Sequence, residues 1–440
     1  MKKLKTVIIL LGDIVVLYGA LTLTLIIRYG ADKFQQPFLD HLKPFSLIFI
    51  IWILVFYLSE LYNYPRFKDG IVLFKTLSTA VAVNFFISIV LFYLLTPLFQ
   101  LTPKTNLIIF SFLFMTLNFG WRLIMVKMFI GGFPRIRLLM IGDSITVNEI
   151  ASCVYSNPQI GYDIVLWLKE EIKTKDIDNL KKSIIENKID VVVLPPHLLK
   201  KDPELTKLVY QLLPLEIEAT TSIDFFEMIF SKAPLEEVEE SWFIEKITAR
   251  RHFYDAIKRI LDMIFGIILL IILLPVMMIT AILIKITSRG AIFYKQSRIG
   301  KNDQPFILYK FRTMKINLSG PLWTKENDER LTFVGKILRR THLDEFPQLY
   351  NIIKGDISFV GPRPERKELA EQYGQLSYYE IRHIIKPGLT GWAQINYRPS
   401  ASIEEAYEKL KYDIYYVKNR SLFLDLQIIF KTIKSLFIKT

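Results

Sequence analysis

Residues 263–286 read MIFGIILLIILLPVMMITAILIKI, an apolar run with a proline at its centre. A helix needs about 20 apolar residues to cross the hydrocarbon core of a bilayer, so this run is long enough. Basic residues favour the cytoplasmic side of a membrane, and both flanks of this run are strongly basic. The basic residues are Arg250, Arg251, Lys258 and Arg259 before the run, and Lys285, Arg289, Lys295 and Arg298 at its end and beyond.

A single straight helix across the membrane cannot keep both of these flanks on the cytoplasmic side. Pro275 removes one backbone hydrogen bond and kinks a helix. The sequence therefore predicts a re-entrant helix, which enters one leaflet, turns at Pro275 and returns to the cytoplasmic face. A plain fifth crossing stays open as the alternative, and it would put the remaining chain outside.

Four further apolar runs precede this one, and they predict a four-helix transmembrane domain over residues 1–133. The loops that follow the second and fourth runs are basic, as is the N-terminus, which places both ends of the domain in the cytoplasm. A cleavable signal peptide is the alternative for the first run, but no small-residue cleavage site follows it. The runs cover about residues 6–27, 45–62, 77–99 and 107–130.

Composition supports a membrane protein. Of the 440 residues 51% are hydrophobic, and the net charge is +13. Such a surplus suits nucleic acid, an anionic membrane surface or anionic substrates. The apolar runs favour the membrane, and we expect no nucleic-acid partner. Cys153 is the single cysteine, which excludes an internal disulfide and a cysteine-based zinc cluster, and the five histidines show no metal-binding spacing.

Residues 134–233 alternate short apolar strands with helices, a pattern that predicts a parallel sheet and a Rossmann-like α/β domain. A dinucleotide site would need GxGxxG after the first strand, but the stretch after Gly142 lacks the second and third glycines. We therefore predict a degenerate folding or interaction module, with an NAD-linked enzyme as the alternative. Residues 234–252 are predicted to be a charged linker. The expected strands are 136–141, 162–168 and 189–195, and the expected helices are 147–155 and 177–187.

Residues 339–349, RRTHLDEFPQL, combine cations and adjacent carboxylates at the start of a predicted helix. Pro347 suits the first helical position, and Gly355 is a plausible stop. Asp344 and Glu345 then lie just before the helix N-terminus, where negative charge is favoured. Helix capping alone is one explanation for them. The other is chemistry, since a carboxylate is able to bind Mg²⁺ or attack phosphorus to form an acyl phosphate.

Four motifs in the last two-fifths of the chain resemble those of the bacterial sugar transferase family, the monotopic polyprenyl-phosphate hexose-1-phosphate transferases. The N-terminal helices and the Rossmann-like domain resemble the long form of that family. The resemblance implies an α-rich α+β catalytic domain over residues 253–440. It also implies transfer of a sugar 1-phosphate from a UDP-sugar to a polyprenyl phosphate, with release of UMP. The motifs are residues 310–314 (KFRTM), 343–349 (LDEFPQL), 361–364 (GPRP) and 386–396 (KPGLTGWAQIN).

The same resemblance assigns roles to residues of this chain. Asp344 resembles the nucleophile that forms a covalent phospho-sugar, and Glu345 resembles its partner, with Mg²⁺ as the cofactor held by both. Pro275 resembles the helix-breaking proline of the family. Departures are Leu274, where many members have serine, and His342, where serine or threonine is common. Candidates to bind substrate phosphate are Lys310, Arg312, Arg339 and Arg363, each with a structural cation as the alternative.

These observations predict a multi-pass protein of the bacterial inner membrane whose catalytic domain lies on the cytoplasmic face. The expected partners are a UDP-sugar, polyprenyl phosphate and membrane lipids, and the surface leaves room for a homodimer. A non-enzymatic membrane scaffold for polysaccharide assembly is a further alternative. The sugar and the polysaccharide pathway are not legible in the sequence. The C-terminal amphipathic segment, about residues 422–438, suits either a membrane surface or core packing.

Overall fold

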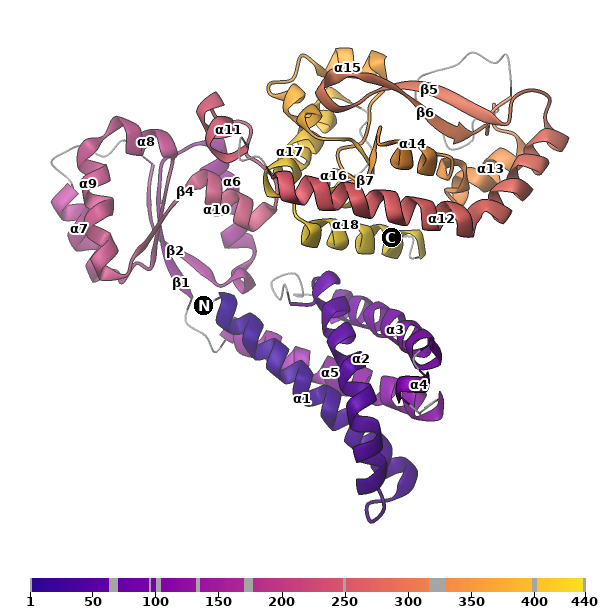
Figure 1. Cartoon of the computed structure of the whole chain (residues 1–440). Helices are drawn as coiled ribbons and strands as arrows, with labels where there is room; N and C mark the ends of the chain where they lie inside the picture. The colour runs from indigo at the N-terminus through magenta and orange to yellow at the C-terminus, as the bar shows by residue number, and fades with distance from the viewer. Residues whose placement is uncertain are drawn as a thin grey trace. The chain divides into compact units, whose positions relative to one another are not determined.

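The computed structural model describes residues 2–62, 70–94, 96–99, 104–131, 135–169, 177–247, 251–315, 330–397 and 402–437. The chain folds as two compact units, Met1–Phe225 and Phe226–Thr440 (Figure 1). The finer domain boundaries expected from the sequence stay predictions. The segment predicted to be a linker contains a helix, α11 (Glu240–Ile247), whose Trp242 and Phe243 are buried.

The four apolar runs at the N-terminus are long helices, as predicted. Each is long and apolar enough to cross a membrane. Aromatic side chains of the second and fourth long helices pack together, Trp52 against Phe114 at 5.3 Å between ring centroids. A buried ion pair joins Arg122 of the fourth to Asp13 of the first at 2.5 Å. The helices are α1 (Lys2–Tyr29), α2 (Gln35–Leu58), α3 (Gly70–Leu94), the short α4 (Thr96–Phe99) and α5 (Lys104–Gly131).

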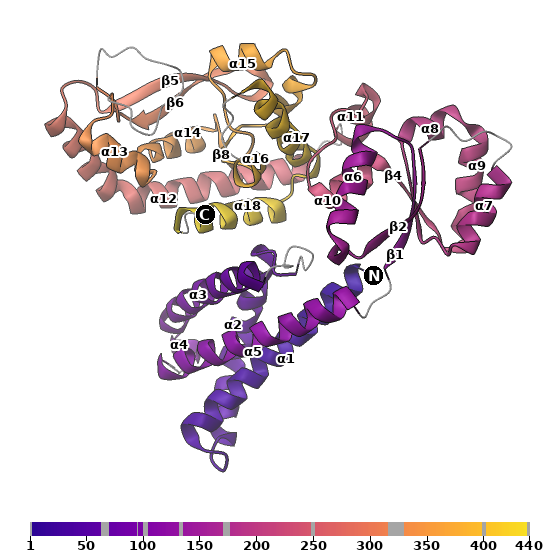
Figure 2. The same cartoon turned by 180° about the vertical axis from the view of Figure 1, so that it is seen from behind.

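A four-stranded sheet follows in the middle of the chain, in the order β2-β1-β3-β4 with all strands parallel. The parallel sheet is confirmed. Helix α6 covers one face, and α7 and α9 cover the other (Figures 1 and 2). The strands are β1 (Ile136–Ile141), β2 (Tyr162–Leu168), β3 (Val191–Leu194) and β4 (Glu218–Thr221), and the helices are α6 (Ile145–Ser156), α7 (Ile177–Glu186), α8 (Pro196–Lys201), α9 (Pro203–Leu212) and α10 (Ser222–Phe230), with 3₁₀ turns η2 (Pro158–Ile160) and η4 (Leu213–Leu215).

The residues of the loop after β1 have structural roles. Gly142 has a positive φ of 99°, and a Cβ there would lie 2.9 Å from the ring of Pro195. The next turn is closed by Ser144, whose side-chain oxygen accepts a hydrogen bond from the backbone N–H of Val147 at 3.2 Å, capping α6. The single glycine of this loop is therefore explained by a tight turn and a helix cap.

The C-terminal unit is mostly helical and contains one long apolar helix, α12. Two small two-stranded sheets, β5–β6 and β7–β8, accompany the helices. The helices are α12 (His252–Thr287), α13 (Phe333–Arg340), α14 (Gln348–Lys354), α15 (Lys367–Tyr373), α16 (Trp392–Asn396), α17 (Ile403–Asn419) and α18 (Leu422–Phe437); the strands are β5 (Phe293–Ile299), β6 (Pro305–Phe311), β7 (Ser358–Val360) and β8 (Gly388–Thr390); the 3₁₀ turns are η5 (Lys301–Asp303), η6 (Leu343–Glu345) and η7 (Tyr379–Ile384).

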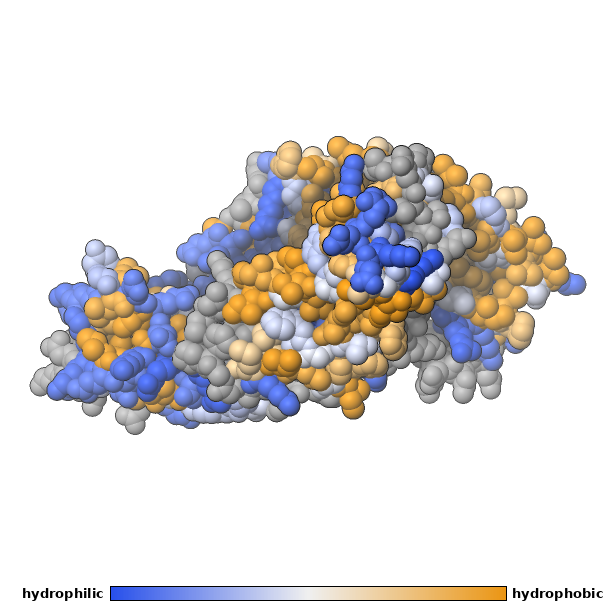
Figure 3. Space-filling view, turned by 90° about the horizontal axis from the view of Figure 1, so that it is seen from below, coloured by the Kyte–Doolittle hydropathy of each residue, from blue (hydrophilic) through white to orange (hydrophobic). Residues whose placement is uncertain are grey.

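Helix α12 begins eleven residues before the predicted apolar run, at His252, and continues through Pro275. Figures 1 and 2 both show it changing direction towards its C-terminal end. Most of its apolar side chains are exposed, including Ile271 (66%) and Ile279 (60%), and the molecular surface in Figure 3 carries large apolar areas. Such a surface needs an apolar environment, and a bilayer supplies one.

Candidate active site

The stretch before the two carboxylates is fixed by a close backbone approach. Helix α13 is capped by Thr332, whose side-chain oxygen accepts from the backbone N–H of Gly335 at 2.9 Å. A Cβ at Gly335 would lie 2.0 Å from the carbonyl oxygen of Thr313. Only glycine allows this contact, which holds α13 against the KFRTM motif.

The carboxylates themselves lie on a single 3₁₀ turn, η6, between α13 and α14. His342 enters the turn in the left-handed region at φ 56°. Pro347, at φ −59°, comes directly before the first residue of α14, and Gly355 ends that helix at φ 95°. The predicted helix and its stop are confirmed, with the start one residue later than expected. Asp344 and Glu345 therefore precede a helix N-terminus, where backbone N–H groups favour anions.

Helix α14 is tied to the elements around it, which fixes the turn at its start. The buried Asn351 side chain accepts from the backbone N–H of Tyr309 at 3.1 Å and donates to the carbonyl of Ile307 at 2.7 Å, both on β6. On the other side Gly266 of α12 lies against Ile353, which a Cβ would approach to 3.1 Å. The turn η6 is therefore held in place by the packing of α14 against β6 and α12.

Glu345 is held as a carboxylate by two cations. Its Oε1 lies 2.5 Å from Nζ of Lys310 and 3.7 Å from the guanidinium of Arg363. Burial alone would favour the neutral acid, but these cations outweigh it and lower the pKa of Glu345 to about 2. Burial also lowers the pKa of Lys310, against the pull of Glu345. Glu345 is thus a carboxylate paired with cations over the physiological pH range.

Asp344, the neighbour of Glu345, has a different environment. Within the part of the chain that the structure describes, its carboxylate makes no hydrogen bond or ion pair. Burial raises the pKa of Asp344, opposed by the charge of Lys310 and reinforced by that of Glu345. An unpaired, partly desolvated carboxylate is a stronger nucleophile than a paired one. The two carboxylates are therefore suited to different tasks.

Of the four predicted phosphate ligands, the structure brings Lys310 and Arg363 to Glu345. Arg312 instead donates to the carbonyls of Ser288 and Arg289 at 3.0 and 2.9 Å, at the C-terminal end of α12. The first of these carbonyls belongs to Ser288, the C-cap of α12, and is one that the end of the helix leaves free. Arg339 donates from Nε to the hydroxyl of Thr313 at 3.0 Å. Phosphate binding by these four residues stays a prediction.

Arg363 is brought to the site by the pairing of β7 with β8. A Cβ at Gly388 would lie 2.0 Å from the backbone nitrogen of Gly361, so the GPRP and KPGLTGW motifs meet through their glycines. The buried Arg382 donates to the carbonyl of Arg363 at 2.8 Å. The backbone of Arg363 is thus fixed while its side chain remains partly exposed.

The carboxylate pair fits Mg²⁺ shared with a substrate. No group of three or more His, Cys, Asp or Glu side chains placed to hold a metal occurs among the described residues. Mg²⁺, however, is commonly bound through one or two carboxylates, waters and the phosphates of the substrate. Asp344 and Glu345 supply those carboxylates, so the ion would be held jointly by the protein and a diphosphate.

Sequence reasoning missed a polar face on α12. Tyr254, Lys258 and Asp262 follow one another at intervals of four residues, which is the spacing of one helix face. The positive charge of this region predicted only a membrane flank. In the structure Arg259 donates to the carbonyls of Ile352 and Ile353 at the end of α14, at 2.7 and 2.6 Å.

Known proteins are similar to the C-terminal part of this chain. The family model described as "Bacterial sugar transferase" matches residues 253–439. The exopolysaccharide production protein PSS of Rhizobium leguminosarum bv. phaseoli is 39% identical over 190 residues, which are 41% of this chain and 94% of that protein. This chain belongs to the bacterial sugar transferase family.

Two longer relatives in this sugar transferase family carry more specific names. The UDP-N-acetylgalactosamine-undecaprenyl-phosphate N-acetylgalactosaminephosphotransferase of Aeromonas hydrophila is 40% identical over 42% of this chain and 44% of its own length. The UDP-glucose:undecaprenyl-phosphate glucose-1-phosphate transferase of Xanthomonas campestris pv. campestris is 28% identical over 67% of this chain and 65% of its own length. The chain thus spans between about two-fifths and two-thirds of these relatives.

Proposed function

We propose that this chain transfers a sugar 1-phosphate from a UDP-sugar to undecaprenyl phosphate and releases UMP. The observation that carries the proposal is that the two adjacent carboxylates differ in their contacts. Glu345 is neutralised by Lys310 and Arg363, whereas Asp344 has no partner among the described residues. The names of the relatives support the donor and the acceptor. The product lipid would enter synthesis of an exopolysaccharide, a capsule or an O-antigen.

In the first step a carboxylate oxygen of Asp344 attacks the phosphorus that carries the sugar. The bond from this phosphorus to the oxygen of the UMP phosphate breaks, and UMP leaves with that oxygen. The product is an acyl phosphate in which Asp344 carries the sugar phosphate. A displacement of this kind divides one difficult transfer into two easier ones.

In the second step a phosphate oxygen of undecaprenyl phosphate attacks the same phosphorus. The bond to Asp344 breaks, the carboxylate is regenerated, and the lipid leaves as a diphosphate-linked sugar. Lys310 and Arg363 are the cations we expect to bind phosphoryl oxygens and to offset the charge of both leaving groups, and their contacts with Glu345, the neighbour of Asp344, support this role. Mg²⁺ held by the two carboxylates would supply further charge neutralisation on the diphosphate.

The proposal includes the membrane topology. Among the described residues, five helices are long and apolar enough to cross a bilayer, and α12 is the most apolar of them. We infer that α12 is re-entrant, with both ends on the cytoplasmic face of the inner membrane, because both flanks are basic and Pro275 lies within the helix. The acceptor phosphate and the catalytic unit would then share one membrane surface.

The decisive test of the reaction compares wild-type membranes with the Asp344→Asn variant. Membranes are incubated with radiolabelled UDP-sugars, Mg²⁺ and undecaprenyl phosphate, and label is counted in the lipid phase. Label that appears only with the wild type supports the nucleophile. Label that survives the substitution contradicts it, and an absence of label with every sugar tested would favour a non-enzymatic scaffold. Chelation with EDTA should abolish transfer, and transfer that survives chelation would remove Mg²⁺ from the proposal.

The re-entrant helix has its own test. Phe253→Cys and Thr287→Cys introduce exposed thiols at the two ends of α12, in a background where Cys153 is replaced by serine. In intact cells an impermeant thiol reagent should label neither position, and after lysis it should label both. Labelling of one position from outside would restore a full crossing.

A further inference from the structure

A cavity of about 110 Å³ lies in the C-terminal unit beside the first turns of α12. Neither Asp344 and Glu345 nor their cations Lys310 and Arg363 line it. Its charged lining has more cations than carboxylates. The cations are Lys258, Arg259, Lys301, Lys386 and Arg420, and the carboxylates are Asp255 and Asp262.

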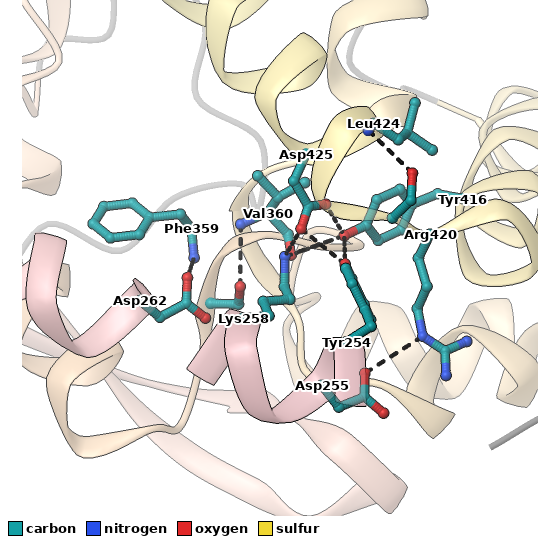
Figure 4. Close-up of polar contacts among 12 residues, drawn as sticks. Tyr254, Asp255, Lys258, Asp262, Phe359, Val360, Tyr416, Arg420, Leu424 and Asp425 are labelled. Carbon is teal, nitrogen blue, oxygen red and sulfur yellow. Dashed lines mark hydrogen bonds and ion pairs between the residues drawn. The ribbon is translucent and has the colours of Figure 1, made fainter. Parts of the chain in front are cut away.

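One wall of the cavity is a fixed hydrogen-bond network, shown in Figure 4. Tyr254 and Lys258 of α12 and Tyr416 of α17 all point to the carboxylate of Asp425 on α18 (Figure 4). The ammonium of Lys258 lies 2.6 Å from that carboxylate. Lys258 is therefore already neutralised, and the network serves to hold the wall rigid.

The other cations are less well balanced. The guanidinium of Arg420 lies 3.6 Å from Asp255, an exposed carboxylate (Figure 4). Arg259 gives two of its donors to neutral backbone carbonyls, those of Ile352 and Ile353. The side-chain ammonium groups of Lys386 and Lys301 make no hydrogen bond or ion pair with any residue that the structure describes. Positive charge is therefore left over on this side of the cavity.

These cations lie close together. Arg259 and Lys386 both approach Gly355. A Cβ at Gly355 would lie 3.0 Å from the guanidinium carbon of Arg259 and 3.2 Å from Nζ of Lys386. Burial lowers the pKa of Lys386, and the neighbouring charges of Arg259 and Lys301 lower it further, opposed by Asp262 and Asp356. Like charges gathered in a partly buried site repel one another unless an anion lies between them.

We propose that this cavity binds the phosphate of an anionic phospholipid headgroup. A cavity volume of about 10–15 Å³ already suffices for one water molecule, so the cavity has room for a group of phosphate size. The cations lie on and beside the polar first turns of α12, directly before its apolar part begins at Met263. The acyl chains of such a lipid can follow the exposed apolar surface of that helix while the headgroup reaches the cations.

The same chemistry would suit a phosphate from a soluble source, such as a nucleotide. The position beside α12 favours the lipid, because a nucleotide has no apolar part to place on an exposed membrane helix. The inference does not depend on the reaction proposed for Asp344. A lipid held here would anchor the start of α12 at the membrane surface.

The test uses the full-length chain in neutral detergent, with lipid binding measured by native mass spectrometry. Phosphatidylglycerol is the probe, and phosphatidylcholine, which has no net charge, is the reference lipid. The test variant combines Lys301→Ala with Lys386→Ala. The control is Lys367→Ala, an exposed lysine of α15 with a side chain 67% exposed. Inorganic phosphate and UMP are titrated separately, to detect a soluble ligand.

We expect the wild type to prefer phosphatidylglycerol, and the double variant to bind it on the order of tenfold more weakly, since each basic group at an anionic surface adds appreciably to affinity. Lys386→Arg should retain binding, and thermal unfolding should show that the double variant is folded. Unchanged lipid binding in the double variant, or an equal loss in Lys367→Ala, would overturn the proposal. So would a double variant that loses phosphate or UMP but keeps the lipid. Asp344→Asn should bind the lipid like the wild type, which separates this test from that of the reaction.

Discussion

Two charged clusters of the C-terminal unit differ in how completely their charges are paired. In the buried cluster, Arg382 lies 2.9 Å from Asp413, and Lys409 lies 2.7 Å from Glu365. Arg382 and Asp413 are almost inaccessible to solvent, with side chains 2% and 3% exposed. In this cluster every ion that the structure places inside has a counter-ion.

The candidate active site is built from the same residue types but leaves one charge unpaired. Glu345 has Lys310 and Arg363, whereas Asp344, beside it, makes no such contact among the described residues. A buried charge that keeps its counter-ion serves the fold, whereas an unpaired, desolvated charge is available for chemistry. Substitutions in the two clusters should therefore have opposite consequences for activity and stability.

The largest expected effect is loss of transfer in Asp344→Asn. An amide cannot displace UMP, so transfer should fall by about 10³-fold or more, the scale seen when a nucleophile is removed. Stability should not fall, because burial raises the pKa of Asp344, which means that its ionised form costs the folded state free energy. Lipid-phase label and the thermal unfolding midpoint report the two quantities. A clear drop in the midpoint would place Asp344 with the structural charges instead.

The second effect concerns the buried cluster. Asp413→Ala leaves the guanidinium of Arg382 buried without its counter-ion, which typically costs about 3–5 kcal/mol of unfolding free energy. Denaturation in detergent measures it. The matched control is Glu371→Ala on α15, which breaks an exposed ion pair with Lys367 and should change stability by less than about 1 kcal/mol. Equal effects of both substitutions would argue against the role of burial.

A smaller effect is expected for Lys310→Met. The change removes the cation closest to Glu345 and one that lowers the pKa of Asp344. We expect kcat/KM to fall by about 10–100-fold, because one charged contact to a phosphoryl group is lost. The acidic limb of the pH profile should move to higher pH, and Lys310→Arg should restore most of it. A limb that does not move would show that Lys310 does not act on Asp344.

The smallest effect is expected when the wild type is acidified: transfer activity should fall at a pH at which the protein is still stably folded. Burial opposes ionisation of Glu365, but Lys409 and Arg382 outweigh it and lower its pKa to about 2. Lowered pKa values of Glu345 and Glu365 keep their ion pairs intact above the ordinary value of 4.5, and the stabilisation is lost only as the pH falls towards 2. Asp344, whose pKa is raised above 3.8, is protonated first.

Transfer should therefore decline reversibly with falling pH while the unfolding midpoint of the C-terminal unit holds. Rates measured after return to neutral pH report reversibility, and thermal scans at each pH report stability. Loss of activity that coincides with unfolding would show that the acidic limb belongs to the fold rather than to Asp344.

Local pattern was enough to find the long apolar helices and the first three strands of the parallel sheet. The four apolar runs at the N-terminus, the strand Tyr162–Leu168 and the helix stop at Gly355 are all set by neighbours in sequence, through hydrophobic length, alternation and a positive φ. Strands β7 and β8, of three residues each, were not predicted, because each is too short to show a period and forms only by pairing with the other.

The sequence by itself determined that cations and two carboxylates would be present, and that α12 would be apolar. Only the tertiary structure decided which cation meets which carboxylate. Lys310 donates a hydrogen bond to Glu345. Arg312, two residues later, instead donates to the end of α12, because β6 ends at Phe311. Arg363 reaches the same carboxylate from a different motif. Side chains of this length choose partners across the fold, and the partners are fixed only when helices and strands pack.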